Sequence, residues 1–328
     1  MKIALVGAGV IARVHMKALL AIGTLPAAIC DIDPKKAQAL LEEFSLELPV
    51  FTDYGRLLAE FSPDVVHICT PHYTHADMVV SALDKNIHVL CEKPLCIREE
   101  EIDRILAAEK RSSATLGVCH QNRYNPANLF FRDYIADKTV TAAHGEVVWH
   151  RDREYYLSGA WRGKWKTEGG GVLINQALHT LDLCQWFFGD PDAVTATAAT
   201  LGLSDVIEVE DTAACTFHGK TPFTFFASNL SAVSLPVCIR ARVGDEDVVL
   251  QPRTVTVNGK PVFHEEQTVV LGKPTYGSGH LRLLADFYRC VNEGVPFPVN
   301  GEEGAKVVRL ILAVYKSGGK QIPLHSQK

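Results

Sequence analysis

Up to about residue 120, short runs of apolar residues alternate with segments whose apolar positions recur at helical spacing. Each run is too short for a helix and suits a strand that is buried on both faces. This alternation predicts a parallel sheet covered by helices on both sides, which is a doubly wound α/β domain. The predicted strands are 3–6, 27–30, 65–69, 87–91 and 115–119, and the predicted helices are 10–20, a helix opened by Pro34, 74–83 and 98–111.

After residue 122 the pattern of apolar residues changes and predicts one long helix followed by strand-like segments. Asn258-Gly259 is a hairpin signal between two short apolar runs. Few helices among many strands predict an α+β domain with a large, open and mostly antiparallel sheet. We therefore expect a Rossmann domain over 1–121 and a second domain over 122–328. The segments predicted here are the helix 171–188, the strands 194–201, 212–217, 223–227, 239–243, 255–257, 261–263 and 268–271, and the closing helices 280–292 and 303–317, with Gly294 and Gly318 as stops.

Composition narrows the function classes. The 328 residues are 47% hydrophobic and 22% charged with a net charge of -5, which is typical of a globular protein and disfavours nucleic acid or an anionic membrane as a partner. The apolar run before Gly7 is too short for a signal peptide, and no stretch approaches the roughly 20 apolar residues of a membrane span. Nine cysteines without a CxxC pair favour reduced core residues and a cytoplasmic location. No histidine or cysteine spacing is typical of a metal site, so we expect no metal.

The first predicted strand runs directly into Gly7-Ala8-Gly9-Val10-Ile11-Ala12, which matches G-x-G-x-x-A. This pattern is weak alone, but a strand before it and a helix after it would aim backbone N–H groups and the helix dipole at a pyrophosphate. Asp31 ends the second strand, where a carboxylate accepts a hydrogen bond from a ribose 2′-hydroxyl and repels a 2′-phosphate. We therefore predict a nicotinamide dinucleotide site that prefers NAD over NADP. The alternative is an ordinary turn with a helix-capping Asp before Pro34.

Two further strands end in chemically useful residues. Thr70-Pro71 and Glu92-Lys93-Pro94 stand at the carboxyl ends of predicted strands, where ligands of open α/β sheets bind. Pro94 disfavours a helical conformation at Lys93, so the lysine side chain can enter the crevice. By frequency alone Lys93 would be a surface residue, but its place directly after a buried strand favours a site role.

The segment 168–182 holds three glycines followed by a helix with a polar stripe. Asn175, His179 and Asp182 share one helix face, and a polar stripe within an apolar helix must find partners in the fold or in a ligand. Histidine titrates near neutral pH and suits proton transfer. The alternative is a satisfied His–Asp pair in the core.

Together these residues make the chain resemble the glucose–fructose oxidoreductase, inositol dehydrogenase and rhizopine-catabolism family, known as Gfo/Idh/MocA. The likeness extends over nearly the whole chain. The segments that carry it are the Gly7 loop, Thr70-Pro71 with His75, Glu92-Lys93-Pro94, Asn122-Arg123-Tyr124, Trp161-Arg162, the helix 169–182 and the ending Phe287…Gly294…Leu312-Ala313-Val314-Tyr315.

The resemblance implies roles for these positions. Lys93 and His179 match the lysine and histidine that lie beside the substrate hydroxyl and the nicotinamide in that family. Many members carry Asp where this chain has Asn175, which cannot act as a base, so proton transfer depends more on Lys93 and His179. The expected cofactor-binding residues are Gly7, Gly9, Val10, Ile11, Asp31, Thr70, Pro71, His75, Glu92, Lys93, Asn122, Trp161 and Arg162. The expected substrate-binding residues are Asn175, Arg123, Tyr124 and Tyr156.

These features predict an NAD-dependent dehydrogenase that moves a hydride between nicotinamide and a secondary hydroxyl of a sugar, cyclitol or sugar derivative. Aromatic and hydrogen-bonding side chains together suit such a polyol. One alternative is a glycosidase or lyase that works through transient sugar oxidation. Another is a dinucleotide-sensing regulator without catalysis. The C-terminal sheet further suggests a homodimer or homotetramer.

Overall fold

The computed structural model describes residues 1–266, 269–273 and 277–324, and it divides the chain into two compact units. The first comprises Met1–Tyr124 with Val269–Ala305, and the second comprises Asn125–Thr268 with Lys306–Lys328. The segment 269–305, which the sequence analysis placed in the second domain, therefore groups with the first unit. Its helix α9 (Gly279–Glu293) packs against α1 (Val10–Ala21). Gly117 leaves room for the rings of Phe287 and Phe297, because a Cβ there would lie 2.8 and 3.0 Å from them.

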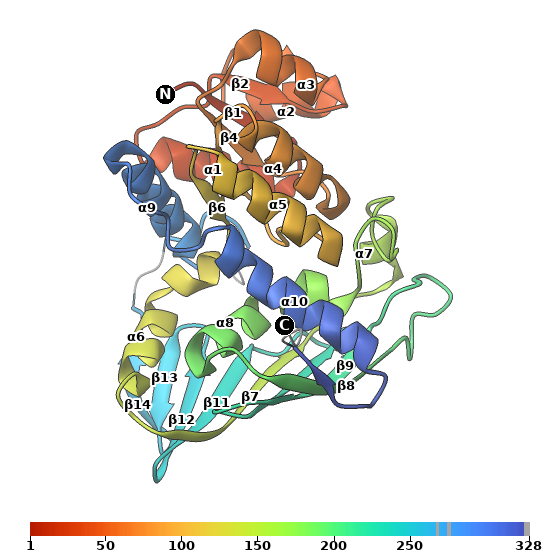
Figure 1. Ribbon diagram of the computed structural model, residues 1–328, viewed down its shortest axis with the longest axis vertical. Coiled ribbons are helices and arrows are strands. Elements are labelled where there is room, and N and C mark those ends of the chain that lie inside the picture. Colours follow the sequence, from red (N-terminus) through yellow and green to blue (C-terminus); the bar gives the residue numbers. More distant parts are fainter. Residues whose placement is uncertain (267–268, 274–276, 325–328) are drawn as a thin grey trace. The chain divides into compact units, whose positions relative to one another are not determined.

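The first unit is built on a six-stranded sheet in the described chain, with the order β3-β2-β1-β4-β5-β6 and parallel pairing throughout (Figure 1). β1 pairs with β2 on one side and β4 on the other, so the strand order reverses there. This arrangement confirms the predicted doubly wound fold. The strands are β1 (Ile3–Val6), β2 (Ala28–Cys30), β3 (Val50–Phe51), β4 (Val65–Ile68), β5 (His88–Cys91) and β6 (Leu116–Val118).

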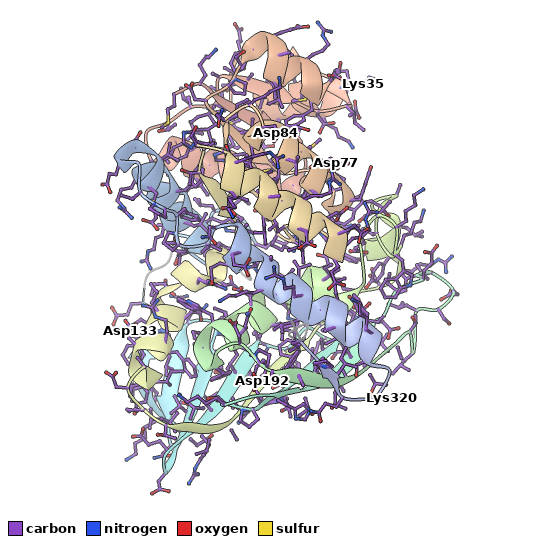
Figure 2. All side chains as sticks on the ribbon, in the orientation of Figure 1. Lys35, Asp77, Asp84, Asp133, Asp192 and Lys320 are labelled. Carbon is purple, nitrogen blue, oxygen red and sulfur yellow. The ribbon has the colours of Figure 1, made fainter. Side chains whose placement is uncertain are left out.

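Local signals set the helices of the first unit. Asp33 caps α2, its side chain accepting a bond from the Lys35 backbone N–H, and Pro34 occupies the first turn. Two ion pairs join α4 to α5 through Asp77 and Asp84, which Figure 2 labels: Asp77 to Arg104 at 2.7 Å and Asp84 to Arg111 at 2.5 Å. The remaining helices are α2 (Pro34–Glu43), α3 (Tyr54–Arg56), a π-helical turn (Leu57–Phe61), 3-10 turns (His72–Thr74 and Gln121–Tyr124), α4 (His75–Leu83) and α5 (Glu99–Arg111).

The second unit is built on a nine-stranded sheet within the described residues, with the order β14-β13-β12-β11-β7-β10-β9-β8-β15. The β7–β10 pair is parallel and the other pairs are antiparallel, so the predicted mostly antiparallel sheet is confirmed. Asn258 and Gly259 have φ values of 49° and 76° and form the predicted hairpin turn. The strands are β7 (Val140–Val148), β8 (Ala193–Ala199), β9 (Thr212–His218), β10 (Phe223–Ser228), β11 (Cys238–Val243), β12 (Glu246–Gln251), β13 (Thr254–Val257), β14 (Lys260–His264) and β15 (Ile322–Pro323).

Helices α6 (Pro126–Ile135) and α8 (Leu178–Phe188) cover one face of this sheet (Figure 1). Gly145 on β7 allows close approach, since a Cβ there would lie 2.6 Å from the Cys184 sulfur on α8. The short helix α7 (Arg153–Leu157) and a π-helical turn (Leu173–Ala177) complete this part, and α10 (Gly301–Ser317) runs from the first unit into the second.

Some sequence predictions for this region were wrong. Residues 269–271 form no strand; Val269 and Val270 are 63% and 37% exposed, so this apolar run is not buried in a sheet. Thr268, the first residue of that predicted strand, lies outside the described residues. Helix α6 and strands β7 and β12 were not predicted from the sequence. None of the described helices combines the length and hydropathy needed to cross a bilayer.

Candidate functional site

The loop after β1 has a shape that requires glycine. Gly7 has a φ of 88°, and its backbone N–H donates to the Cys30 carbonyl at 2.7 Å. A Cβ at Gly7 would lie 2.7 Å from the Cys69 carbonyl oxygen, so any side chain would push β1 and β4 apart. Gly9 is the N-cap of α1 without a side-chain cap, and a Cβ there would meet nothing within 4 Å. The N-terminus of α1 therefore opens onto space that a phosphate can occupy.

Asp31 closes the same loop from β2. Its Oδ2 accepts a hydrogen bond from the Ala8 N–H at 2.7 Å and its Oδ1 accepts one from the Asp33 N–H at 2.8 Å, which fixes the carboxylate and leaves it further acceptor capacity. Ile32 is 90% exposed beside it and Val10 is 64% exposed at the start of α1. An anion-binding helix end, a fixed carboxylate and exposed apolar side chains together fit a dinucleotide. Ile32 was not predicted as a site residue, although an apolar residue directly after a strand-ending aspartate could have indicated it.

The ends of β4 and β5 are tied together by His75. This ring is fully buried, and its two nitrogens lie 2.8 Å from the Thr70 carbonyl oxygen and 2.7 Å from the Pro94 carbonyl oxygen. Burial lowers the pKa of His75, although both carbonyl contacts oppose that shift. The side chains of Thr70 and Thr74 share a 2.7 Å hydrogen bond. His75 therefore holds the segments that carry Thr70-Pro71 and Glu92-Lys93-Pro94 in register.

A buried hydrogen-bonded chain lies behind Glu92. His15 Nε2 is 3.0 Å from Glu92 Oε1, His15 Nδ1 is 2.8 Å from His67 Nδ1, and His67 Nε2 is 2.7 Å from the Tyr288 hydroxyl. The other Glu92 oxygen accepts the Lys93 backbone N–H at 3.2 Å. This series of hydrogen bonds therefore runs from Tyr288 of α9 to the backbone of Lys93, which is half-buried.

The charges and hydrogen bonds of this buried network keep Glu92 ionised. Burial raises the pKa of Glu92, but hydrogen bonding and charge from His15, with His280 and Lys93, outweigh it and hold the pKa below its usual range. Burial lowers the pKa of His280 to about 4 and that of His67 well below its usual value. Cys119 Sγ lies 3.8 Å from His15 Nε2. Mutual hydrogen bonding accounts for the gathering of His15, Glu92 and Cys119, and the absence of a metal stays a prediction.

Two residues predicted to bind substrate have structural partners in the first unit. Arg123 is 5% exposed and forms a 2.8 Å ion pair with Glu303 at the start of α10. The Tyr124 hydroxyl donates to Asp286 of α9 at 2.8 Å. Both residues thus fasten the returning segment 269–305, and their role toward substrate stays a prediction. Asn122, between the buried Gln121 and Arg123, is half-buried.

In the second unit, the glycine-rich segment presents two polar side chains. Every residue from Glu168 to Gln185 is buried except Asn175 and His179, which are half-buried. Asp182 is fully buried, so only two of the three polar residues assigned to this face reach the surface. Asn175 lies in the π-helical turn, a feature that is frequently found at functional sites. A π turn leaves no pattern in the sequence that could have predicted it.

Glu210 anchors the start of this helix from β9's leading loop. Its Oε2 accepts the Gly171 N–H at 2.8 Å, and its Oε1 accepts the Leu173 N–H at 3.0 Å and the Tyr315 hydroxyl at 2.9 Å. The two bonds from Gly171 and Leu173 satisfy backbone donors that a helix start leaves unpaired. Burial nevertheless raises the pKa of Glu210 to about 7, because the carboxylate is completely desolvated.

This raised pKa predicts a pH-dependent difference between wild type and Glu210→Gln. An acid with a raised folded-state pKa stabilises fully below its unfolded value of 4.5, and this stabilisation is lost as pH rises through 7. Urea unfolding should show the wild type losing about 2 kcal/mol relative to Glu210→Gln between pH 5 and pH 8. A stability difference that stays constant over this range would contradict the assignment. Glu208→Gln, at an exposed position nearby, is the control.

Tyr155 is the hub of the side chains around Asn175. Its hydroxyl receives Arg162 Nη1 at 2.6 Å, Gln176 Nε2 at 2.8 Å and Asn175 Nδ2 at 3.3 Å. The Asn175 amide also donates to the buried carboxylate of Glu168, which accepts the Gly163 N–H as well. Neither Tyr155 nor Glu168 was among the site residues predicted from the sequence.

Tyr156, predicted to bind substrate, is instead 3% exposed and packs with Ile207 and Val209. Its hydroxyl receives the Asn229 amide at 2.8 Å, and burial raises the pKa of this phenol. Any effect of Tyr156 on a ligand is therefore expected to act through Asn229 and Gln176, which share a 3.1 Å hydrogen bond.

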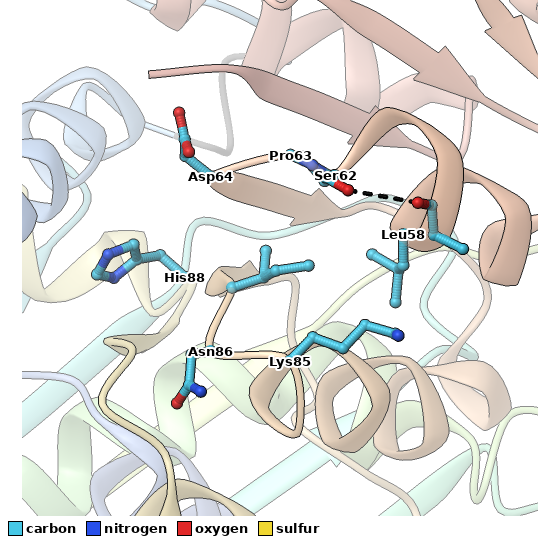
Figure 3. Close-up of a pocket in the computed structure, with 9 residues that line it drawn as sticks. Leu58, Ser62, Pro63, Asp64, Lys85, Asn86 and His88 are labelled. Carbon is cyan, nitrogen blue, oxygen red and sulfur yellow. Dashed lines mark hydrogen bonds between the residues drawn. The ribbon is translucent and has the colours of Figure 1, made fainter.

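A separate open pocket of about 570 Å³ lies in the first unit at the amino ends of β4 and β5. Asp64, Lys85 and His88 line it, with Ser62 bonded to the Ala59 carbonyl at its rim (Figure 3). Nucleotides bind at the carboxyl ends of such strands, so this pocket is distinct from the candidate dinucleotide site.

Comparisons with known families agree with this architecture. Residues 1–120 match the family described as "Oxidoreductase family, NAD-binding Rossmann fold", and residues 139–238 match the "GFO/IDH/MocA C-terminal domain". The inositol 2-dehydrogenase of Salmonella typhimurium is 26% identical over 193 residues, which cover 58% of this chain and 55% of that protein. This chain thus spans about half the length of those curated relatives in the alignment. The myo-inositol 2-dehydrogenase of Thermotoga maritima is 22% identical over 97% of this chain and 96% of its own.

A solved structure extends the likeness to the whole chain. The WlbA dehydrogenase from Bordetella pertussis, in complex with NADH and UDP-GlcNAcA, is 27% identical with a TM-score of 0.88, covering 100% of this chain and 98% of that one. A levoglucosan dehydrogenase in complex with NADH and levoglucosan has the same TM-score at 20% identity, which shows a shared fold.

Proposed function

Because this chain belongs to the GFO/IDH/MocA family of NAD-binding oxidoreductases, we propose that it oxidises a secondary hydroxyl of a sugar, cyclitol or sugar derivative with NAD. The observation that carries the proposal is the pairing of a dinucleotide-shaped loop at Gly7 with a half-buried Lys93 at the end of β5. Relatives named inositol 2-dehydrogenase and levoglucosan dehydrogenase, and a WlbA dehydrogenase solved with UDP-GlcNAcA, support this substrate class.

The proposed reaction needs one hydride carrier and one proton carrier. When bound, the nicotinamide supplies the hydride acceptor, and the substrate carbon loses a hydride as its hydroxyl loses a proton. Neutral Lys93 takes this proton, and in the reverse direction the protonated amine returns it. His179 is the second candidate for the proton step, since it is half-buried in a stretch, 178–185, that is otherwise buried. Asn175, held by Tyr155 and Glu168, orients the hydroxyl.

Some residues are proposed to act by holding the ligand-binding residues in place. Glu92 fixes the Lys93 backbone, and His75 holds the strand ends on which Thr70-Pro71 and Lys93 lie. We place Gly7, Gly9, Val10, Ile11 and Asp31 against the dinucleotide. Asn122, Trp161 and Arg162 remain proposed cofactor contacts. Self-association into a dimer or tetramer also remains a proposal, which size-exclusion chromatography with light scattering would test.

The decisive experiment is a screen of sugars, cyclitols and sugar nucleotides with NAD and NADP, followed by absorbance at the NADH band. Accumulation of NADH with any of these polyols supports the proposal. Sugar cleavage without net NADH would indicate the glycosidase or lyase alternative, and NAD binding with neither reaction would indicate a sensor.

Asp31 predicts the cofactor preference. Replacing Asp31 by Ser removes the charge that repels a 2′-phosphate and the acceptor for the 2′-hydroxyl, so the ratio of kcat/KM for NAD over NADP should fall about tenfold or more. The measurement is steady-state kinetics with each cofactor. Asp33→Ser, which changes the neighbouring helix cap, should leave the ratio unchanged. Equal use of NAD and NADP by the wild type would contradict the role of Asp31.

A further inference from the structure

Two arginines near Asn175 differ from their neighbours in the second unit. The guanidinium carbon of Arg151 lies 4.9 Å from the Tyr155 ring centroid, and that of Arg162 lies 4.5 Å from it. Within the described residues neither guanidinium forms an ion pair, whereas Arg153, two residues after Arg151, pairs with Asp205 at 2.7 Å. Two cations thus share one aromatic ring without a carboxylate between them.

The hydrogen-bond inventory around Tyr155 has more donors than acceptors. The Nε–H of Arg151 is buried and has no partner in the described chain. A buried donor without an acceptor is unfavourable, so an oxygen acceptor from a ligand would be stabilised here. Three N–H donors converge on the Tyr155 oxygen, which has two lone pairs. The Tyr155 oxygen therefore has no acceptor capacity left for Arg151.

The local charge points the same way. Glu168 is the buried carboxylate of this group, and it already accepts bonds from Asn175 and from the Gly163 backbone. Two guanidinium groups and one carboxylate leave one positive charge. Stacking on aromatic rings, which for Arg151 include Trp149 at 5.0 Å and for Arg162 include Trp161 at 4.7 Å, holds each guanidinium in a fixed orientation. Preorganised guanidiniums recognise carboxylate or phosphoryl oxygens by charge-assisted hydrogen bonds.

We propose that Arg151, stacked on Tyr155 beside Arg162, forms an anion-binding subsite, and that the preferred substrate is a sugar derivative bearing a carboxylate or a phosphoryl group. This inference rests on the proposed function and names its substrate class. Arg151 carries the substrate contact, because its unpaired Nε–H and its half-buried side chain give it donors to offer. The contact is independent of the dinucleotide loop, whose residues all lie in the first unit.

The test compares matched charged and neutral probes. D-glucuronate is set against D-glucose for a carboxylate, and α-D-glucose 1-phosphate against methyl α-D-glucoside for a phosphoryl group. Calorimetric titration in the presence of NADH should give tighter binding for one charged member of a pair. Arg151→Met should weaken that binding about tenfold to a hundredfold and change the neutral probe less than about threefold. Arg151→Lys should restore part of the loss, and raising the NaCl concentration should weaken only the charged probe.

Controls separate this subsite from the cofactor site and from the fold. Arg153→Met, at an exposed and ion-paired neighbour, should behave as wild type. Equal loss for charged and neutral probes in Arg151→Met, or a loss confined to NAD binding, would overturn the inference. Wild-type oxidation of neutral sugars with no gain for charged ones would overturn it while leaving the proposed function intact. If no sugar is oxidised, the proposed function fails, yet the binding titrations still decide whether the subsite exists.

Discussion

Replacing Lys93 by methionine is expected to lower kcat at least about a hundredfold while the Kd for NAD changes less than about threefold. Methionine keeps the length and apolar bulk of the half-buried side chain and removes only the amine. The backbone at this position is fixed independently, because Glu92 accepts the Lys93 N–H at 3.2 Å and is itself held by His15 at 3.0 Å. Loss of turnover would therefore report the missing proton carrier rather than a displaced strand.

The measurement is steady-state turnover with the best substrate of the screen, together with NAD titration by fluorescence. Lys85→Met, at an exposed lysine just before β5, is the matched control and should keep wild-type turnover. His179→Asn tests the second candidate under the same conditions. If Lys93→Met retains wild-type turnover while His179→Asn does not, the proton step belongs to His179.

The first unit was largely predictable because its strands are buried on both faces. β1 is a continuous apolar run, and β4 and β5 are apolar apart from one histidine each. The candidate site residues Gly7, Thr70 and Lys93 follow within two residues of the ends of these strands. Sequence could not show that 269–305 returns to this unit. That return depends on a tertiary match between Gly117 and two phenylalanine rings, which no local pattern encodes.

The second unit was harder for a physical reason. Strand β7, which is central in its sheet, contains the polar or small residues Thr141, His144, Gly145 and Glu146. Buried positions alternate with half-buried positions only from Ala143 onward, so the first part of the strand lacks the pattern of a half-buried strand. The helix with Asn175 and His179 was found from its apolar positions, whereas the π turn and the Glu210 anchor arise from packing between distant segments. Tyr155 was not predicted because its role depends on the side chains that donate hydrogen bonds to its hydroxyl. Those contacts form only in the folded structure.

Gly171→Ala is expected to destabilise the protein by about 3 kcal/mol or more, or to prevent folding of the second unit. A Cβ at this position would lie 1.9 Å from the Glu210 carbonyl oxygen and 2.9 Å from its carbon. This backbone cannot withdraw cheaply, because the same carbonyl accepts the Val172 N–H at 3.0 Å while the Glu210 side chain accepts the Gly171 N–H at 2.8 Å.

Urea unfolding followed by tryptophan fluorescence measures this cost. Gly55→Ala is the control, since its Cβ would meet only the Asp53 side-chain oxygen at 3.2 Å. Because Gly171 begins the segment that presents Asn175 and His179, any folded fraction of Gly171→Ala should also lose turnover with NAD binding retained by the first unit. Wild-type stability in Gly171→Ala would mean that the helix start can shift without strain, and the close approach of Glu210 would then not be what sets the position of the two polar side chains.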